Sequence, residues 1–166
     1  KNVNPEHIKP VIDKLEEAGC KIETEKNIIK LEAPKRLKAV DIRTMPYPGF
    51  PTDMQAIFGA TLSTAHGTSI ITETIFENRF KYIGELQRMG AKIKIEGNTA
   101  IIKGVRKLYG AKVKVADLRG GASLVLAGLS AKGKIEINDI KYILRGYEKF
   151  DEKLKALGAR IDILIK

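Results

Sequence analysis

The sequence contains no tryptophan, one cysteine and two histidines among its 166 residues, and it has no long apolar run. The single cysteine, Cys20, excludes an intrachain disulfide and suits a reducing compartment. His7 and His66 lie far apart without other metal-ligand residues nearby, and neither a GxxxxGK(S/T) nor a GxGxxG pattern is present. No apolar run approaches the ~20 residues of a membrane span, and the start does not resemble a signal peptide. We therefore expect a cytoplasmic protein with no cofactor, no metal and no membrane partner.

Aromatic residues are also scarce, with five Tyr and five Phe, whereas charge is abundant: 30 Lys and Arg stand against 20 Asp and Glu, a net charge of +10. This excess permits an anionic partner without selecting one, and the solvated surface of a thermophile protein explains it equally well. Basic tracts, stacking platforms and nucleic-acid motifs are not evident. We expect no nucleic-acid partner, and a basic scaffold or RNA-binding module remains the alternative from another functional class.

A pattern of helix, glycine and alternating residues occurs three times. In its first occurrence Asn4 is the expected N-cap, and the alternating runs 21–24 and 28–31 predict a hairpin. The glycines recur at intervals of about 70 residues, which indicates an internal repeat. The expected helices and their terminal glycines are 5–18 with Gly19, 79–89 with Gly90, and 147–157 with Gly158.

The second and third occurrences also contain an earlier strand, helix and strand, so the predicted unit is β-α-β-α-β-β in an α/β domain. These extra elements are expected at 39–43, 53–65 and 68–74, and again at 112–116, 121–131 and 134–138. The length suits one domain, with repeat units at about 1–37 (partial), 38–106 and 107–166. Because the chain begins at Lys1 without the strand expected before its first helix, we interpret it as a piece of a longer polypeptide.

The two fuller units differ in one loop, which contains Pro46, Pro48 and Pro51 and cannot be a helix or strand interior. The segment from Arg43 to Gly67 is ten residues longer than the segment 119–133, which we take as its equivalent. An insertion that interrupts a regular repeat is a candidate site. Asp53 follows it at a helix start, where the carboxylate would act either as an N-cap or as a general base.

Arg79, Arg119 and Arg145 each follow a strand and lie near a helix start, and Arg79 and Arg145 occupy equivalent corners of the repeat. Guanidinium groups stay charged and donate bidentate hydrogen bonds, so they suit carboxylate and phosphate groups. An arginine taken alone is more often a surface or ion-pair residue, but three in matching motifs favour an anion site. Asp117 is either a second catalytic carboxylate or the group that orients Arg119 or Arg79.

Five motifs carry a resemblance to a known family. The sequence is similar to the UDP-N-acetylglucosamine enolpyruvyl transferases over nearly its whole length, and the motifs occur in that family's order. They are FPTDMQA (50–56), ITETIFENRF (71–80), DLR (117–119), SLVLAGL (123–129) and RGYE (145–148). The 3-phosphoshikimate enolpyruvyl transferases are the runner-up, and FPTDMQA, FENRF and RGYE favour the nucleotide-sugar branch.

The resemblance implies an enzyme that transfers the enolpyruvyl group of phosphoenolpyruvate to the 3-hydroxyl of UDP-N-acetylglucosamine and releases phosphate. This is the first committed step of peptidoglycan synthesis, on which bacterial cell shape and division depend. It also implies two domains, each an inside-out α/β barrel of three units with helices inside and sheets outside. The chain would supply about two and a half units of the C-terminal domain, and without the N-terminal domain it would be inactive.

The resemblance further implies roles for individual residues. Asp53 would be the general base on the sugar hydroxyl, and Asp117 and Arg145 would also be catalytic. The backbone at Ile75 and Phe76 would lie against the nucleotide sugar. The three arginines expected to bind substrate are Arg79, Arg119 and Arg145.

Overall fold

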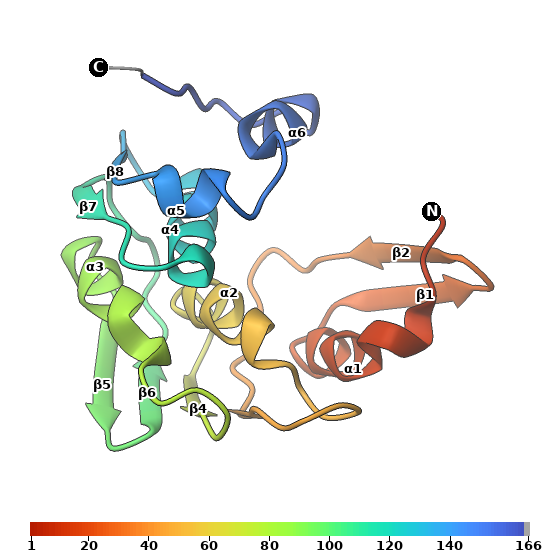
Figure 1. Cartoon of the computed structure of the whole chain (residues 1–166). Helices are drawn as coiled ribbons and strands as arrows, with labels where there is room; N and C mark the ends of the chain where they lie inside the picture. The colour runs from red at the N-terminus through yellow and green to blue at the C-terminus, as the bar shows by residue number, and fades with distance from the viewer. Residues whose placement is uncertain (165–166) are drawn as a thin grey trace.

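The structure, a computed structural model, describes residues 1–164. Its first part is a helix followed by a hairpin, red and orange in Figure 1. The helix begins as a 3-10 turn, and the Asn4 side chain accepts a hydrogen bond from the Glu6 N–H, which confirms the predicted cap. The hairpin is antiparallel, with Lys21 opposite Glu32. These elements are η1 (Pro5–Ile8), α1 (Lys9–Glu17), β1 (Lys21–Glu25) and β2 (Ile28–Glu32).

The middle part has the predicted β-α-β-α-β-β order. Its four-stranded sheet runs β3-β4-β6-β5, with β3 parallel to β4 and β6 antiparallel to both of its neighbours. The elements are β3 (Ile42–Arg43), α2 (Thr52–Leu62), β4 (Thr68–Thr72), η2 (Arg79–Tyr82), α3 (Ile83–Arg88), β5 (Lys92–Glu96) and β6 (Thr99–Lys103).

The last part repeats the first half of this unit. Strands β7 and β8 pair in parallel with Val113 opposite Ile137, as Ile42 lies opposite Ile71 in the middle part. The predicted helix 147–157 is shorter than expected, because Lys149 has left-handed backbone angles (φ 48°, ψ 45°) and the helix begins after it. The elements are β7 (Lys112–Lys114), α4 (Leu118–Ser130), β8 (Glu136–Asn138), α5 (Lys141–Leu144) and α6 (Phe150–Ala156).

Residues 159–164, where the repeat predicts another strand, form no strand. In the middle part, the equivalent strand β5 lies at the edge of the sheet and pairs with β6, the strand that follows it. The end of this predicted strand, residues 165–166, lies outside the described residues.

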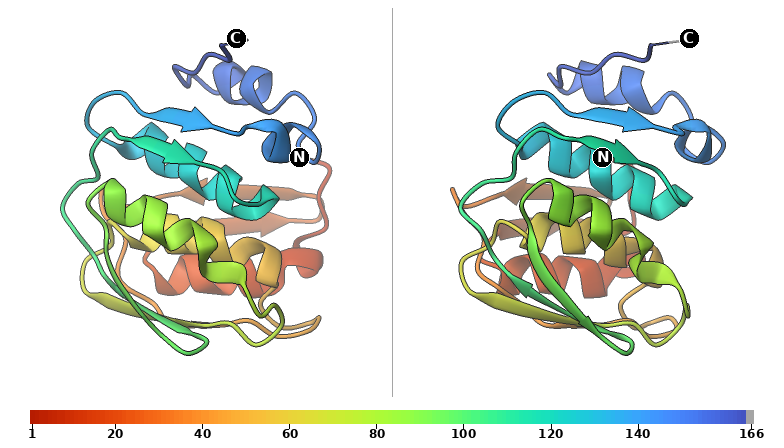
Figure 2. Two further views of the ribbon diagram at one scale, coloured as in Figure 1. Left: turned by 60° about the vertical axis from the view of Figure 1, so that its left-hand side comes forward. Right: turned by 90° about the vertical axis from the view of Figure 1, so that its left-hand side faces the viewer.

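Helices α2 and α4 form the interior of the molecule, and they make the most extensive contact between elements. Figures 1 and 2 show them toward the centre, with the sheets around them. Both helices are apolar on nearly all sides, a composition typical of buried helices: six residues of α2 and seven of α4 are buried. This arrangement of helices inside and sheets outside confirms the predicted fold class.

The repeat glycines have the backbone conformation that the prediction required. Gly19, Gly90 and Gly158 have φ of 99°, 92° and 93°, which a side chain would strain. None of the helices among residues 1–164 is long and apolar enough to span a bilayer.

Candidate active site

The proline-containing segment 45–51 is a loop, as predicted, and it returns to the strand it leaves. The Met45 N–H donates to the Phe50 carbonyl, and Thr44 pairs with Phe50 in an isolated bridge. Helix α2 then begins at Thr52, with Pro51 in the N-cap position and no side-chain cap. The N-cap interpretation of Asp53 is therefore wrong: it is the second residue of the helix, and its carboxylate is free to bind other groups.

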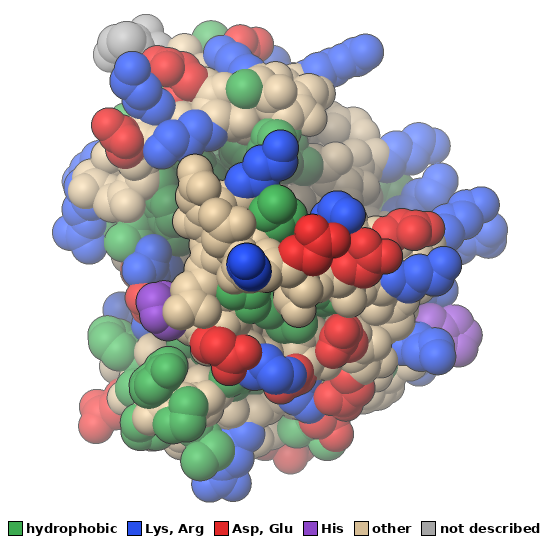
Figure 3. All heavy atoms as spheres, turned by 90° about the vertical axis from the view of Figure 1, so that its right-hand side faces the viewer, with side chains coloured by type: hydrophobic (Ala, Val, Ile, Leu, Met, Phe, Trp, Pro, Cys, Tyr) green, Lys and Arg blue, Asp and Glu red, His purple; other side chains and the backbone are tan. Residues whose placement is uncertain are grey.

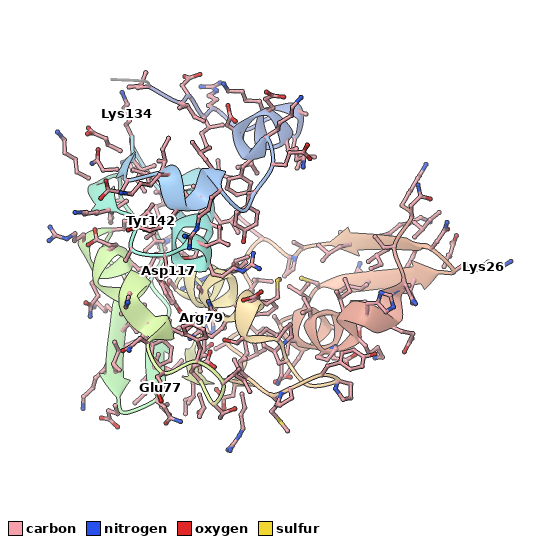
Figure 4. The ribbon with its side chains drawn as sticks, viewed as in Figure 1. Lys26, Glu77, Arg79, Asp117, Lys134 and Tyr142 are labelled. Carbon is pink, nitrogen blue, oxygen red and sulfur yellow. The ribbon has the colours of Figure 1, made fainter. Side chains whose placement is uncertain are left out.

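Both oxygens of Asp53 are bound by arginines. Arg79 Nη2 donates to Oδ1 at 2.9 Å, and Arg119 Nη2 donates to Oδ2 at 2.6 Å. The Asp53 side chain is 52% exposed, whereas those of Arg79 and Arg119 are 10% and 27% exposed. We call these three residues the arginine clamp. Figure 4 shows Arg79 on the side of the molecule where η2 meets α4.

The arginine clamp keeps Asp53 ionised. The hydrogen bond from Arg119 lowers the pKa of Asp53 below its ordinary value, and the charges of both guanidiniums add to this, while partial burial opposes it. The same hydrogen bond raises the pKa of Arg119 above its usual value. A stable negative charge therefore lies between two permanent positive charges at the surface.

The internal repeat explains why Asp53 and Arg119 meet. Asp53 is the second residue of α2, and Arg119 is the second residue of α4. The two helices occupy equivalent positions in their units and pack against each other, so equivalent positions face each other at the helix starts.

The structure corrects the predicted size of the loop insertion. Because Ile42 pairs with Ile71 and Val113 with Ile137, the residue equivalent to Arg43 is Lys114 rather than Arg119. The surplus in the proline loop is therefore five residues rather than ten.

Each arginine of the clamp also contacts an aromatic ring. The Arg79 guanidinium lies 4.5 Å from the centre of the Phe76 ring. Arg119 lies 5.5 Å from the Tyr147 ring and donates from Nη1 to the Tyr147 hydroxyl at 2.9 Å. Tyr147 was not among the predicted site residues, although its position two residues after Arg145 in RGYE was a usable signal.

Ile75 and Phe76 lie in the loop after β4, with side chains 44% and 56% exposed. Their backbone N–H groups donate to the Glu73 carboxylate at 2.8 and 3.0 Å. Glu73 itself is only 4% exposed and was also missed by the sequence reasoning. It is the one acidic residue in the otherwise apolar and polar-uncharged run 68–75, and this contrast could have identified it.

Among the described residues, no hydrogen bond or ion pair joins Asp117 or Arg145 to the arginine clamp. Asp117 caps α4 by accepting from the Gly120 N–H at 2.8 Å. No hydrogen bond or ion pair among residues 1–164 joins it to Arg79 or Arg119. Arg145 is exposed at the end of α5, with its guanidinium 5.5 Å from the Tyr142 ring, which Figure 4 labels.

The site offers a carboxylate that can accept a proton and guanidiniums that can bind anions. Among residues 1–164, no group of three His, Cys, Asp or Glu side chains is arranged to hold a metal ion. Figure 3 shows that acidic and basic side chains are intermixed on the face that carries α1 and the hairpin, so on that face the excess positive charge is dispersed.

Comparison with known proteins relates this chain to the enolpyruvyl transferases. A family model described as EPSP synthase (3-phosphoshikimate 1-carboxyvinyltransferase) matches residues 1–154. UDP-N-acetylglucosamine 1-carboxyvinyltransferase 1 of Caldanaerobacter subterraneus subsp. tengcongensis is 59% identical over 160 residues, 96% of this chain and 39% of that protein. The UDP-N-acetylglucosamine 1-carboxyvinyltransferase of Thermodesulfovibrio yellowstonii is 57% identical over 156 residues, 94% of this chain and 38% of that protein. The chain thus spans about two fifths of the length of these two relatives.

Two solved structures share the fold. The enolpyruvyl transferase NikO from Streptomyces tendae superposes with a TM-score of 0.84 at 25% identity, over 93% of this chain and 36% of that one. The EPSP synthase from Acinetobacter baumannii superposes with a TM-score of 0.68 at 19% identity, over 94% of this chain and 37% of that one, and supports the fold alone.

Proposed function

This chain belongs to the EPSP synthase (3-phosphoshikimate 1-carboxyvinyltransferase) family, and on that premise we propose that it is one wall of the active site of a UDP-N-acetylglucosamine enolpyruvyl transferase. The enzyme would transfer the enolpyruvyl group of phosphoenolpyruvate to the 3-hydroxyl of UDP-N-acetylglucosamine, for peptidoglycan synthesis in the cytoplasm. The observation that carries this proposal is the arginine clamp, in which an ionised Asp53 lies between Arg79 and Arg119.

Asp53 would act as the general base. As the sugar oxygen bonds to C2 of phosphoenolpyruvate, the hydroxyl proton would pass to the Asp53 carboxylate, and C3 would take a proton from a general acid on the opposite wall of the site. In the resulting tetrahedral intermediate, the conjugate base of that acid would take a proton back from C3 while the C2–O bond to phosphate breaks. Phosphate is then released and the C2=C3 double bond is restored. The two guanidiniums would bind the carboxylate and phosphate of phosphoenolpyruvate, because they are permanent cations with forked donors.

The clamp geometry fits a base that substrate binding activates. Without substrate, the arginines lower the pKa of Asp53, which makes it a weak proton acceptor. An anionic substrate that takes hydrogen bonds from Arg79 and Arg119 would relieve this effect, so the pKa of Asp53 would rise as the reactants assemble.

The remaining predicted residues would complete this wall. Arg145 would be a third cation for the anionic substrate, and Asp117 a second carboxylate. Ile75 and Phe76, which are exposed beside Arg79, would lie against the nucleotide sugar. The opposite wall would come from an N-terminal domain of a longer polypeptide, so we do not expect this segment to be active alone.

The test is phosphate release by the full-length polypeptide supplied with phosphoenolpyruvate and UDP-N-acetylglucosamine. Asp53→Asn should lower kcat by about a hundredfold or more, because the reacting hydroxyl loses its proton acceptor. Asp117→Asn and Arg145→Lys should each lower turnover by about tenfold or more while changing thermal stability little.

Asp13→Asn is the matched control, since Asp13 is an exposed acid on α1 paired with Lys9. Full activity in Asp53→Asn would contradict the assignment of the base. Turnover of 3-phosphoshikimate in place of the sugar nucleotide would favour the runner-up, which is the activity named in the description of the matching family model. Salt-dependent RNA binding without sugar-nucleotide binding would favour the basic scaffold instead.

A further inference from the structure

Glu73 joins three separate segments beside the arginine clamp. Its Oε1 accepts hydrogen bonds from the Thr44 hydroxyl at 2.7 Å and from the Ile75 and Phe76 N–H groups at 2.8 and 3.0 Å. Its Oε2 accepts from the Thr52 hydroxyl at 2.9 Å. A carboxylate that is only 4% exposed requires such donors, because burial without hydrogen bonds is costly. The end of β3, the loop after β4 and the start of α2 are thereby held together.

Thr52 connects Glu73 to the arginine clamp. Its hydroxyl has one proton, which it donates to Glu73, so its lone pairs remain for another donor. That donor is Arg79 Nε at 3.1 Å. The guanidinium is planar, so fixing Nε at Thr52 and Nη2 at Asp53 fixes the plane of the whole group.

We propose that Glu73 and Thr52 act together as positioning residues that hold the Arg79 guanidinium in the plane required to bind both Asp53 and an anionic substrate. In this proposal neither residue touches the substrate. The proposal rests on the proposed function, and it adds to that function the residues that hold one of its arginines in place. Thr52 links the buried Glu73 carboxylate to Arg79 through two hydrogen bonds. The centre of the Phe76 ring lies 4.5 Å from the guanidinium. The same carboxylate orders the backbone of Ile75 and Phe76.

The central experiment replaces the Thr52 hydroxyl with a methyl group of nearly the same size. In the full-length polypeptide, Thr52→Val should lower kcat/KM for phosphoenolpyruvate by about ten- to hundredfold, because Arg79 loses a charge-assisted partner. The loss should fall mainly on KM for phosphoenolpyruvate, with KM for the sugar nucleotide changed less. Thr52→Ser keeps the hydroxyl and should retain activity within about twofold.

The matched control is Thr61→Val in the same helix. The Thr61 hydroxyl donates only to the Ile57 carbonyl one turn earlier, so removing it should leave kcat/KM within about twofold.

A second readout is independent of activity: the Arg79 Nε–H signal in NMR spectra and the Asp53 titration. Thr52→Val should shift the Arg79 signal and raise the titration midpoint of Asp53, whereas Thr52→Ser and Thr61→Val should change neither. Thr52→Ala serves as the second variant if the valine variant does not fold.

The outcomes separate this inference from the proposed function. Full activity and an unchanged Arg79 signal in Thr52→Val would overturn the positioning role. Equal losses in Thr52→Val and Thr61→Val would also overturn it, because the effect would then come from the helix as a whole. If the unmodified polypeptide releases no phosphate but the Arg79 and Asp53 signals respond as expected, the positioning role stands and the proposed function fails.

Discussion

Asp53 binds its two arginines most strongly when it is charged, and this couples the arginine clamp to pH. Its pKa is lowered in the folded protein, so its contribution to stability is complete above the pKa of the unfolded chain, about 3.9. The contribution is lost as the pH falls through the lower pKa of the folded state. Because the side chain is half exposed, solvent screening keeps the effect modest.

We therefore expect Asp53→Asn to reduce the free energy of unfolding by a constant amount between about pH 6 and 8, and by progressively less below about pH 4. Urea unfolding at several pH values measures this difference. Asp13→Asn, which removes an exposed acid from α1, should show a small difference throughout. A loss in Asp53→Asn that is as large at pH 3 as at pH 7 would contradict the charge-dependent role.

The predicted residues differ in how well their positions and roles could be predicted from the sequence. The motifs were sufficient to select Asp53, Arg79 and Arg119, which the structure brings together. Asp53 does not cap α2, because the helix starts two residues earlier than an N-cap at Asp53 requires. At the start of α4, the equivalent helix, Asp117 is the N-cap. Glu73 was missed because its importance depends on Thr44 and Thr52, which are distant in sequence and meet it only in the folded chain.

At the scale of elements, the repeat could be predicted because α1, α3 and α6 are each followed by a glycine with positive φ and because the residues of the two hairpins alternate. The boundaries were less predictable: 3-10 turns precede α1 and α3, and Lys149 delays α6. Whether residues 159–164 form a strand could not be predicted from their own sequence, since a strand forms only where a partner supplies hydrogen bonds.

Close backbone contacts between elements restrict which residues fit at certain positions. A Cβ on Gly104 would lie 1.9 Å from the Ala65 carbonyl oxygen, which also accepts from Arg36 and is therefore held in place. We expect Gly104→Ala to destabilise the protein by about 3 kcal/mol or more, measured by urea unfolding. Gly84→Ala is the matched control, because Gly84 lies in α3 with open space around its Cβ position. That variant should be more stable by about 0.5–1 kcal/mol. Equal effects of the two substitutions would contradict this account.

At the scale of the whole molecule, the candidate site arises where two repeats meet rather than within one of them. Packing α2 against α4 brings their first turns together, and the residues at equivalent positions carry opposite charges, Asp53 and Arg119. The repeat also pairs each corner arginine with an aromatic residue three positions earlier, as Phe76 with Arg79 and Tyr142 with Arg145. The repeat thus accounts for the placement of the cations, and a difference between the repeats at one position accounts for the carboxylate of Asp53.

Arg36 is one of the residues that join the first part of the chain to the middle part. Its guanidinium donates to the carbonyls of Thr64, Ala65 and Val105 at 2.8, 2.9 and 3.1 Å. Two of these carbonyls follow the C-terminal end of α2, where the helix dipole favours a positive charge. Lysine at this position would keep the charge but could not reproduce the planar arrangement of donors.

We expect Arg36→Lys to lower the free energy of unfolding by about 1–2 kcal/mol, because carbonyls at the junction lose their donors. Hydrogen exchange should show the largest loss of protection at residues 18–38, since the Lys38 and His66 N–H groups bond across this junction. Arg88→Lys is the control, because Arg88 is an exposed partner of Glu85 within one helix, and its loss should cost less than about 0.5 kcal/mol. Protection lost evenly across the chain would mean that the two parts unfold as one unit, and Arg36 would then stabilise the molecule without acting as a junction.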